Sequence, residues 1–322
     1  MTDAAPWVDL YRVMRLIRRF EEEVQRQFLR GEVYGSTHLC VGQEAVSAGV
    51  APLIGERDWV ACTYRGHGHC LALGMDPQAL LDELLGRATG TCGGRAGSMN
   101  VVDHAHRLIG CFGIVGGTMA AAIGAGLALR RSGGVSVAFF GDGTANQAYF
   151  HECLNFAAVM RLPVLFLCEN NQYGEFTPMA NSTSGTLLAR PQAMGIPAHQ
   201  VDGNDMWAVR AAAEEAFERI REGEGPRFLE AHTYRFSDHG RGDPVSYRPE
   251  GEVERWRERD PLLVARRRLA SDYGITEEAL DAVDRDVDGD VEAMATRALA
   301  SPFPDPDQPR SEFKGARVAA HG

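Results

Sequence analysis

Polar side chains that carry oxygen atoms follow two apolar stretches of the sequence. Asp142, flanked by two glycines, comes directly after the apolar run 135–140, and Asn171 follows the run 163–168. Because ligands of an open parallel sheet bind outside the carboxyl ends of its strands, we expect these two residues to be neighbours in space. A carboxylate and an amide oxygen suit Mg²⁺, which usually keeps phosphate and water oxygens in its shell. The sequence therefore predicts a Mg²⁺ site that holds a diphosphate.

The residues around Asp142 favour the same interpretation. Gly141 and Gly143 let backbone N–H groups approach phosphate oxygens. A helix that we expect to begin near Thr144 would direct the positive end of its dipole to the same place. A Walker-type phosphate loop and Schiff-base catalysis are excluded, because both need a placed lysine and the one lysine, Lys314, follows a Pro-rich segment.

The elements that must position these loops alternate between strand and helix. Apolar runs predict strands at 59–64, 135–140, 163–168 and 227–234. Apolar side chains at helical spacing, with Asp76-Pro77 as a helix start, predict helices at 7–30, 76–85, 116–130, 147–160, 206–221, 262–273 and 277–299. Continuous apolar strands joined by helices are typical of a doubly wound, mainly parallel α/β sheet, here with N- and C-terminal helical extensions.

We divide the chain into three parts. Residues 1–34 are predicted to form an N-terminal helical arm, 35–255 the α/β domain, and 256–322 C-terminal helices and a Pro-rich tail packed on the same domain. The glycine-dense segment 86–98 is predicted to be a functional loop. The small residues of 116–130 would let that helix approach a neighbouring backbone, at the centre of the fold or at a subunit contact.

Composition limits the function classes. The 322 residues carry a net charge of −11, which argues against nucleic acid or an anionic membrane as partner. No apolar run is long enough to span a bilayer and no export signal is visible, so we expect a cytoplasmic protein. The seven cysteines contain no CxxC pair and suit reduced core thiols better than disulfides or a zinc site.

Longer motifs resemble a known family. Gly-Asp-Gly at 141–143 and Asn-Asn at 170–171 resemble the signature of thiamin-diphosphate enzymes. The segments HLCVGQEAV (38–46), TYRGHGHC (63–70), GRAGSMN (94–100), CENNQYGEFTP (168–178) and TYRFSDHGRGDPVSYR (233–248) are similar to the alpha subunit of the first component of 2-oxo acid dehydrogenase complexes. Among these subunits, the sequence resembles the acetoin and pyruvate dehydrogenase types most. The resemblance implies the thiamin-diphosphate-binding fold, with thiamin diphosphate and Mg²⁺ as cofactors.

The resemblance also implies roles for individual residues. Asp142 and Asn171 would bind Mg²⁺ through their side chains, and Tyr173 through its backbone carbonyl. Arg65 and Arg235 would neutralise the diphosphate, as the guanidinium fork suits phosphate oxygens. The other implied cofactor contacts are Tyr64, Gly113, Val115, Gly143, Thr144 and His239, with Gly113 and Val115 offering backbone contacts to the aminopyrimidine ring. His38 and His239 would be catalytic, stabilising or protonating intermediates at the reacting end.

A partner is implied as well. The family's alpha subunit works with a beta subunit in an α₂β₂ heterotetramer, with the cofactor at their interface. Our candidates for that contact are the helix 116–130 and the loops 86–112 and 236–248. The implied enzyme is an oxidoreductase that cleaves a small carbonyl substrate, acetoin or a 2-oxo acid, and passes the acyl group to a lipoyl acyltransferase.

Three residues in two segments depart from the family pattern. Asn100 replaces a histidine, and Asp238 and Gly240 flank His239 where the family has glycine and serine. We expect the carboxylate of Asp238 to raise the pKa of His239. These departures favour an alternative, an acyl-loading or carboligating enzyme that delivers a two-carbon unit to an acyl carrier protein or an aldehyde. A non-catalytic scaffold of the same fold is a third hypothesis.

Overall fold

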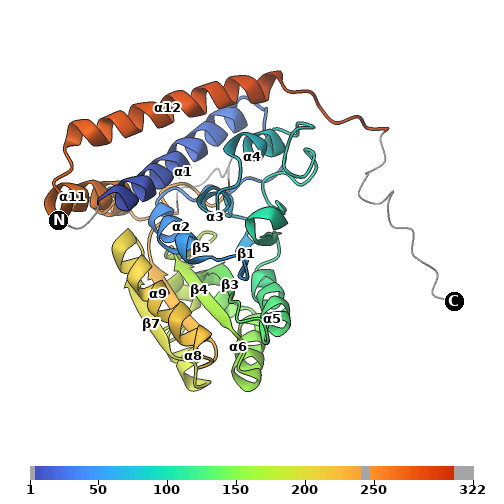
Figure 1. The fold of residues 1–322 in the computed structure, drawn as a ribbon, viewed down its shortest axis with the longest axis vertical. Coiled ribbons are helices and arrows are strands. Elements are labelled where there is room, and N and C mark those ends of the chain that lie inside the picture. The colour runs from blue at the N-terminus through green and yellow to red at the C-terminus, as the bar shows by residue number, and fades with distance from the viewer. Residues whose placement is uncertain (1–3, 241–246, 308–322) are drawn as a thin grey trace.

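Six parallel strands form the central sheet, which a computed structural model describes together with the rest of residues 4–240 and 247–307 (Figure 1). The strands lie in the order β2-β1-β3-β4-β8-β7. Their bounds are β1 Trp59–Thr63, β2 Leu108–Phe112, β3 Ser136–Gly141, β4 Val164–Asn170, β7 Ala198–Asp202 and β8 Arg227–His232. A short antiparallel ribbon joins β5 (Tyr173–Gly174) to β6 (Thr177–Pro178). This architecture confirms the predicted α/β fold class.

Helices cover both faces of the sheet because successive strand residues face opposite sides. Val137 and Phe139 of β3 pack in one apolar cluster with α9 (Met206–Arg221). Phe140 packs in a second cluster with α5 (Gly117–Leu129) and α6 (Ala148–Met160). The small residues of α5 allow the close approach that we expected. A Cβ on Gly126 would lie 2.6 Å from a methyl group of Val164 in β4.

The remaining helices surround this core. They are α1 Ala5–Leu29, α2 Glu44–Val50, α3 His67–Ala72, α4 Pro77–Leu84, α7 Met179–Ser182, α8 Ala189–Ala193, α10 Glu252–Arg257, α11 Pro261–Tyr273 and α12 Glu277–Ala300, with short 3₁₀ helices at Ala51–Leu53, His104–His106 and Asp142–Asn146. The predicted helices correspond to α1, α4, α5, α6, α9, α11 and α12. The predicted start of a helix near Thr144 is wrong, because residues 142–146 form a 3₁₀ helix and α6 begins only at Ala148. Among the described residues, no helix is both long and apolar enough to cross a membrane.

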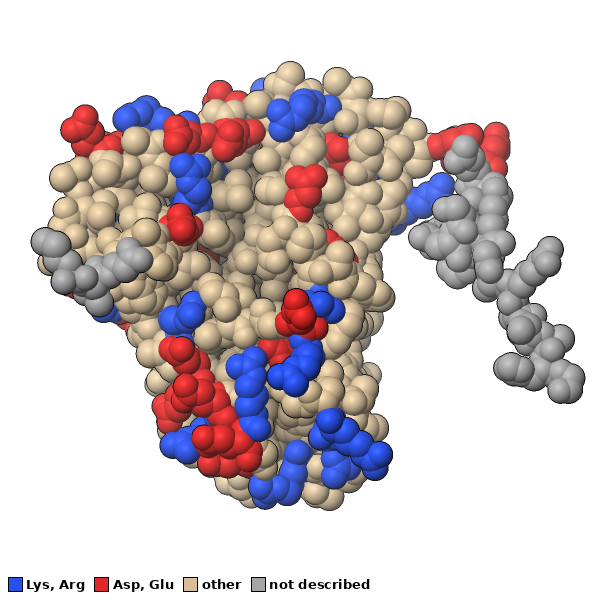
Figure 2. All heavy atoms as spheres, viewed as in Figure 1, with Lys and Arg blue, Asp and Glu red and all other residues tan. Residues whose placement is uncertain are grey.

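The terminal helices α1 and α12 lie side by side at one end of the molecule (Figure 1). Arg12 and Arg15 of α1 pair with Asp286 and Asp288 of α12 at 3.1 and 2.6 Å. Figure 2 shows acidic and basic side chains next to one another along this edge. Exposed pairs of this kind contribute little each, so apolar packing holds the two helices together. The predicted boundary at 255/256 falls inside α10, and the three-part division stays a prediction.

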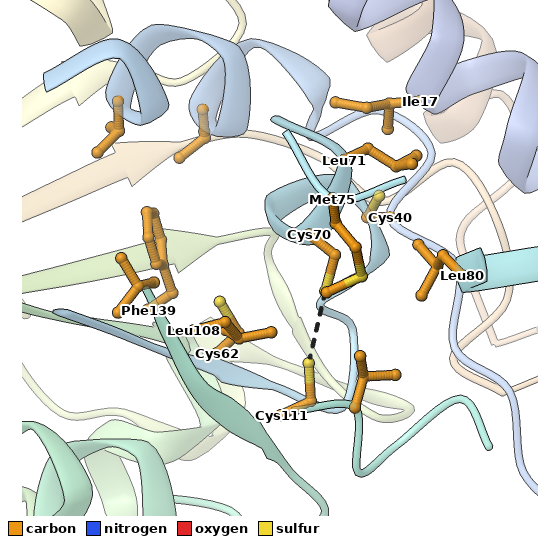
Figure 3. Packing of buried hydrophobic residues seen from close by; sticks show 14 of the residues in the cluster. Ile17, Cys40, Cys62, Cys70, Leu71, Met75, Leu80, Leu108, Cys111 and Phe139 are labelled. Carbon is orange, nitrogen blue, oxygen red and sulfur yellow. Dashed lines mark hydrogen bonds between the residues drawn. The ribbon is translucent and has the colours of Figure 1, made fainter. Parts of the chain in front are cut away.

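Six of the seven cysteines are buried, as expected of core thiols. Cys62 of β1, Cys70 of α3 and Cys111 of β2 lie together in the core shown in Figure 3, although they are scattered in the sequence. The sulfur atoms of Cys70 and Cys111 are 4.0 Å apart. Burial raises the pKa of the Cys62 thiol well above its usual range, which suits an apolar packing role.

The glycine-dense loop 86–98 is organised by one buried carboxylate. Glu83 of α4 accepts hydrogen bonds from the backbone N–H groups of four loop residues, at 2.6 to 3.1 Å, namely Cys92, Gly94, Ala96 and Gly97. The backbone of Ala88 also donates to the carbonyl of Pro302 behind α12. The loop is therefore fixed by hydrogen bonds to Glu83 of α4 and to Pro302 in the C-terminal segment.

Candidate functional site

The loops after β3 and β4 meet at the carboxyl edge of the sheet. Gly141 at the end of β3 is paired with Glu169 in β4, so Asp142 and Asn171 leave the sheet from adjacent strands. A Cβ on Gly143 would lie 3.4 Å from the Cα of Gly174, which means that glycine at both positions lets the two loops touch. The strand order thus brings the two predicted Mg²⁺ ligands to one place.

A cleft of about 500 Å³ opens at this edge. Every residue to which the sequence analysis gave a role in binding or catalysis lines it: His38, Tyr64, Arg65, Gly113, Val115, Asp142, Gly143, Thr144, Asn171, Tyr173, Arg235 and His239. They come from the carboxyl ends of five strands and from the loop before α2. The structure therefore gathers the whole predicted set, while the role of each residue stays a prediction.

Asp142 is an acidic side chain that is almost fully removed from water, with 2% of its surface exposed. Burial raises the pKa of its carboxyl group to about 6. Hydrogen bonds from the backbone N–H groups of Asp142 and Asn171, and the charge of Arg235, oppose this rise. A nearby cation would stabilise the ionised form further, as expected for a ligand of a divalent metal.

The loop after β4 turns sharply between its two predicted ligands. Gln172 adopts φ +76°, in the left-handed region that non-glycine residues seldom occupy. The backbone N–H of Tyr173 donates to Oδ1 of Asn171 at 3.3 Å. Asn171 and Tyr173 both line the cleft, whereas Gln172 does not. The left-handed backbone of Gln172 therefore lets the residues on both sides of it, Asn171 and Tyr173, face the cleft.

Arg65 and Arg235 are buried in the cleft, and within residues 4–240 and 247–307 neither is paired with a carboxylate. Their hydrogen bonds go to backbone carbonyls, to the ring of His239 and to the hydroxyl of Tyr247. Burial and the charge of Arg65 lower the pKa of Arg235 to about 10. Since these two buried guanidinium groups have no anionic partner in the described part of the chain, the cleft is a favourable place for an anion.

His38 and His239 lie edge to face, with ring centroids 4.9 Å apart. Burial, together with the charges of Arg65 and Arg235, lowers the pKa of His239 to about 3. The expectation that Asp238 would raise this pKa is wrong, because the loss of water and the charges of Arg65, far away in the chain, and Arg235, four residues away, lower it instead. Burial lowers the pKa of His38 to about 3 as well, so both imidazoles are neutral near pH 7.

The oxygen ligands and the arginines of the cleft fit the predicted cofactors, Mg²⁺ and thiamin diphosphate. Among the described residues, no three His, Cys, Asp or Glu side chains are grouped to hold a metal ion. The predicted site is of another kind, since it uses one carboxylate, one amide and one backbone carbonyl. A hard cation accepts such oxygens and takes the rest of its shell from phosphate and water. Arg65 and Arg235 would face the phosphate charge.

Comparisons with known proteins identify the family. The model of the dehydrogenase E1 component family matches residues 12–307. The chain belongs to the dehydrogenase E1 component family. It is 40% identical over 309 residues to the alpha subunit of acetoin:2,6-dichlorophenolindophenol oxidoreductase of Cupriavidus necator, covering 95% of this chain and 93% of that one. It is 41% identical over 299 residues to the pyruvate dehydrogenase E1 component subunit alpha of Rhizobium meliloti, covering 92% and 86%.

Membership of the E1 family confirms the predicted resemblance to its alpha subunits and the predicted oxidoreductase class. A third relative, the pyruvate dehydrogenase E1 component subunit alpha of Zymomonas mobilis, is 41% identical over 309 residues, covering 94% of this chain and 86% of its own. Since relatives named for acetoin and for pyruvate are similar to the same degree, identity alone does not choose between the two substrates.

Two further residues of the cleft were not singled out in the sequence. Gln43 accepts a hydrogen bond from Nδ2 of Asn171 at 3.2 Å, and Glu169 accepts one from His69 at 3.0 Å. Both line the cleft. Gln43 lies in HLCVGQEAV and Glu169 in CENNQYGEFTP, so the motifs contained them. Their partners lie about 100 or more residues away in the chain, and no local spacing indicates them.

Gln43 is positioned by a close approach of two segments. Gly42 has φ +99°, and a Cβ there would lie 2.3 Å from the carbonyl oxygen of Tyr234. Only glycine lets the chain pass so close and still present Gln43 to the cleft. With its Nδ2 bonded to Gln43, the Asn171 amide keeps Oδ1 on the other side, where it accepts from Tyr173 and has a second lone pair for the predicted metal ion.

Replacement of Gln43 tests that orientation. In the Gln43→Leu variant we expect the affinity for Mg²⁺, measured by calorimetry with thiamin diphosphate and the beta subunit present, to fall about tenfold, the usual cost of losing a group that orients a metal ligand. Gln200→Leu on the exposed edge strand β7 is the control. Equal Mg²⁺ affinity in both variants would contradict the orienting role.

The lowered pKa of His38 has a consequence for acid stability. The unfolded chain takes up a proton at this residue near pH 6.5, whereas the folded chain does so only near pH 3. The unfolded state therefore binds more protons in this range, and the contribution of His38 to stability is lost as the pH falls. We expect His38→Gln to flatten the fall in the free energy of unfolding between pH 6.5 and pH 4, measured by urea titration. His199→Gln, at an exposed position in β7, should leave the slope unchanged.

Proposed function

We propose that this chain is the alpha subunit of a thiamin-diphosphate- and Mg²⁺-dependent dehydrogenase that cleaves acetoin or a small 2-oxo acid. The observation that carries the proposal is that, among the described residues, the buried Arg65 and Arg235 have no acidic partner and lie in the same cleft as the buried carboxylate of Asp142. Such a site suits a diphosphate bound through a divalent cation. The relatives' names, alpha subunits of acetoin and pyruvate enzymes, support the substrate class.

In this proposal Asp142 and Asn171 bind Mg²⁺ through side-chain oxygens, and Tyr173 binds it through its carbonyl. Arg65 and Arg235 neutralise the diphosphate. The backbone of Gly143 and Thr144 approaches phosphate oxygens, and Tyr64, Gly113 and Val115 contact the rest of the cofactor. The chemistry that thiamin diphosphate would supply here is that of a carbanion toward a carbonyl group.

The histidines are placed for the reacting end of the cleft. His38, His239 and Tyr64 form one aromatic group, with centroid distances of 4.4 to 6.0 Å between their rings. Neutral imidazoles next to two guanidinium groups offer N–H donors without adding further charge. They would orient the carbonyl substrate and stabilise negative charge on its oxygen.

A beta subunit completes the proposed enzyme as an α₂β₂ heterotetramer. The described part of the chain exposes large apolar side chains beside the cleft and along α5 and α6, which is typical of a face that a partner covers: Ile114, Val115, Leu127, Tyr149, Phe156 and Val159. Of the predicted contact loops, 236–248 lies partly outside the described residues. The proposed acyl acceptor is a lipoyl acyltransferase, and the cytoplasmic location stays a prediction.

The test is reconstitution with a beta subunit of the same family from the same organism. We expect reduction of a dye acceptor with acetoin or a small 2-oxo acid only when both subunits, thiamin diphosphate and Mg²⁺ are present. A panel of acetoin, pyruvate and branched 2-oxo acids then assigns the substrate. Absence of calorimetric binding of thiamin diphosphate with Mg²⁺ to the assembled pair would overturn the proposal.

The same assay separates the alternative chemistry. Asn100 is exposed, while its neighbour Met99 lines the cleft, so the departure from the family histidine lies at the rim. Acyl transfer to a lipoyl domain supports the dehydrogenase. Transfer to an acyl carrier protein or ligation to an aldehyde, without transfer to lipoyl, supports the acyl-loading or carboligating enzyme instead.

A further inference from the structure

His239 is held from two sides by buried arginines. Nη1 of Arg235 lies 2.9 Å from Nδ1 of the His239 ring. Nη2 of Arg65 donates to the backbone carbonyl of the same residue at 3.0 Å. Both arginines are almost completely removed from water, and the cleft therefore fixes the backbone and the ring of His239 together.

The contact at Nδ1 determines where the ring carries its proton. A guanidinium group has N–H donors and no acceptor, so Nδ1 of His239 must be the acceptor in this hydrogen bond. A neutral imidazole carries one N–H, and with Nδ1 accepting, that hydrogen sits on Nε2. Burial and two nearby positive charges keep the ring neutral, since they lower the pKa of His239 to about 3.

Arg235 is itself held in one orientation. Its Nη2 donates to the backbone carbonyl of Glu175 at 2.9 Å and to the hydroxyl of Tyr247 at 2.6 Å. These two bonds, one to Glu175 in the β5–β6 ribbon and one to Tyr247, fix the plane of the Arg235 guanidinium. Nη1 is thereby kept on the histidine ring.

We propose that Arg235 is a positioning residue that fixes His239 in its Nε2–H tautomer, so that His239 serves the cleft as a hydrogen-bond donor through Nε2. The sequence left open whether this histidine stabilises or protonates, and the tautomer limits the answer to donation from one atom. The acceptor is an oxygen of the carbonyl substrate or of the phosphate, and for that identity alone the inference rests on the proposed function. Arg235 thus has a second role besides facing the diphosphate.

Side-chain amides can test which ring nitrogen matters. The amide nitrogen of glutamine occupies roughly the place of Nε2, and that of asparagine roughly the place of Nδ1. In the reconstituted complex we expect His239→Gln to keep turnover within about tenfold of the parent, and His239→Asn and His239→Ala to lose about 10²-fold or more. Turnover of His239→Asn equal to or above that of His239→Gln would overturn the proposal.

The tautomer can also be observed without any reaction. The full chain, labelled with ¹⁵N in its histidines, should give for His239 an unprotonated Nδ1 and a protonated Nε2 in ¹H–¹⁵N spectra, with the signals assigned by their absence from His239→Gln. A protonated Nδ1 would overturn the inference. In Arg235→Met we expect a mixture of tautomers, and a weaker effect of the same kind in Tyr247→Phe, which keeps the arginine. Unchanged His239 signals in Arg235→Met would contradict the positioning role of Arg235.

These two measurements separate the inference from the proposed function. The spectra require neither thiamin diphosphate nor the beta subunit. If the expected tautomer is found and no cofactor binds the reconstituted pair, the proposed function fails while the inference holds. If cofactor binds and Nδ1 is protonated, the inference fails alone.

Discussion

Replacing Asp142 by asparagine should strongly weaken Mg²⁺-dependent binding of thiamin diphosphate while leaving the cofactor-free chain as stable as the parent or slightly more stable. The two effects have one cause. The buried carboxylate of Asp142 costs stability when it is ionised, as its raised pKa of about 6 indicates. An amide of the same shape removes that cost and also removes the only charge that the side chains of the predicted metal site offer to the cation.

The Asp142→Asn experiment uses calorimetry and thermal unfolding on the complex with the beta subunit. We expect the affinity for Mg²⁺ and cofactor to fall roughly 100-fold or more, about 3 kcal/mol, with no loss in the melting temperature of the chain without cofactor. Glu152→Gln, on an exposed position of α6, is the matched control. Cofactor affinity of Asp142→Asn within a few-fold of the parent would remove Asp142 from the metal site.

The sequence predicted the centre of the sheet and missed its edges. The predicted strands correspond to β1, β3, β4 and β8, which occupy the four inner positions. They are covered on both faces and read as continuous apolar runs. The edge strands β2 and β7 were not predicted. β7, with the sequence AHQVD, exposes most of its side chains and therefore lacks the apolar signal.

The position of the candidate site was predictable for a related reason. Asp142 and Asn171 directly follow inner strands, and parallel strands bring their carboxyl ends to one edge. The electrostatics were not predictable. Asp238, next to His239 in the chain, is not among the groups that shift its pKa, whereas Arg65, from the end of β1, is. Such contacts depend on how distant segments pack, and residue spacing does not encode them.

The glycine-dense loop 86–98 was predictable from the sequence in one respect and not in another. Its glycines identified it as a loop, and Met99 immediately after it lines the cleft, while its functional role stays a prediction. What holds the loop is a residue of the preceding helix, Glu83, which reads in the sequence as an ordinary helical glutamate. A single carboxylate that satisfies four backbone donors leaves no periodic signal.

Replacing Glu83 by glutamine should destabilise the chain and release this loop. The fully buried carboxylate of Glu83 accepts from Cys92 and Gly94 with one oxygen and from Ala96 and Gly97 with the other. Glutamine keeps one oxygen and turns an NH₂ group toward two N–H donors. Hydrogen bonds to a charged group contribute about 1.5–3 kcal/mol each, so losing two should lower the free energy of unfolding by about 3–6 kcal/mol.

Urea unfolding measures the loss of stability in Glu83→Gln, and limited trypsin digestion measures the release of the loop, because Arg87 and Arg95 lie within it. We expect cleavage at these arginines to be much faster in Glu83→Gln than in the parent under conditions where both chains stay folded. Glu214→Gln, at an exposed position of α9, should match the parent in both measurements. If Glu83→Gln unfolds at the parental urea concentration and resists trypsin equally, the carboxylate does not hold the loop, and its four hydrogen bonds contribute no net stability.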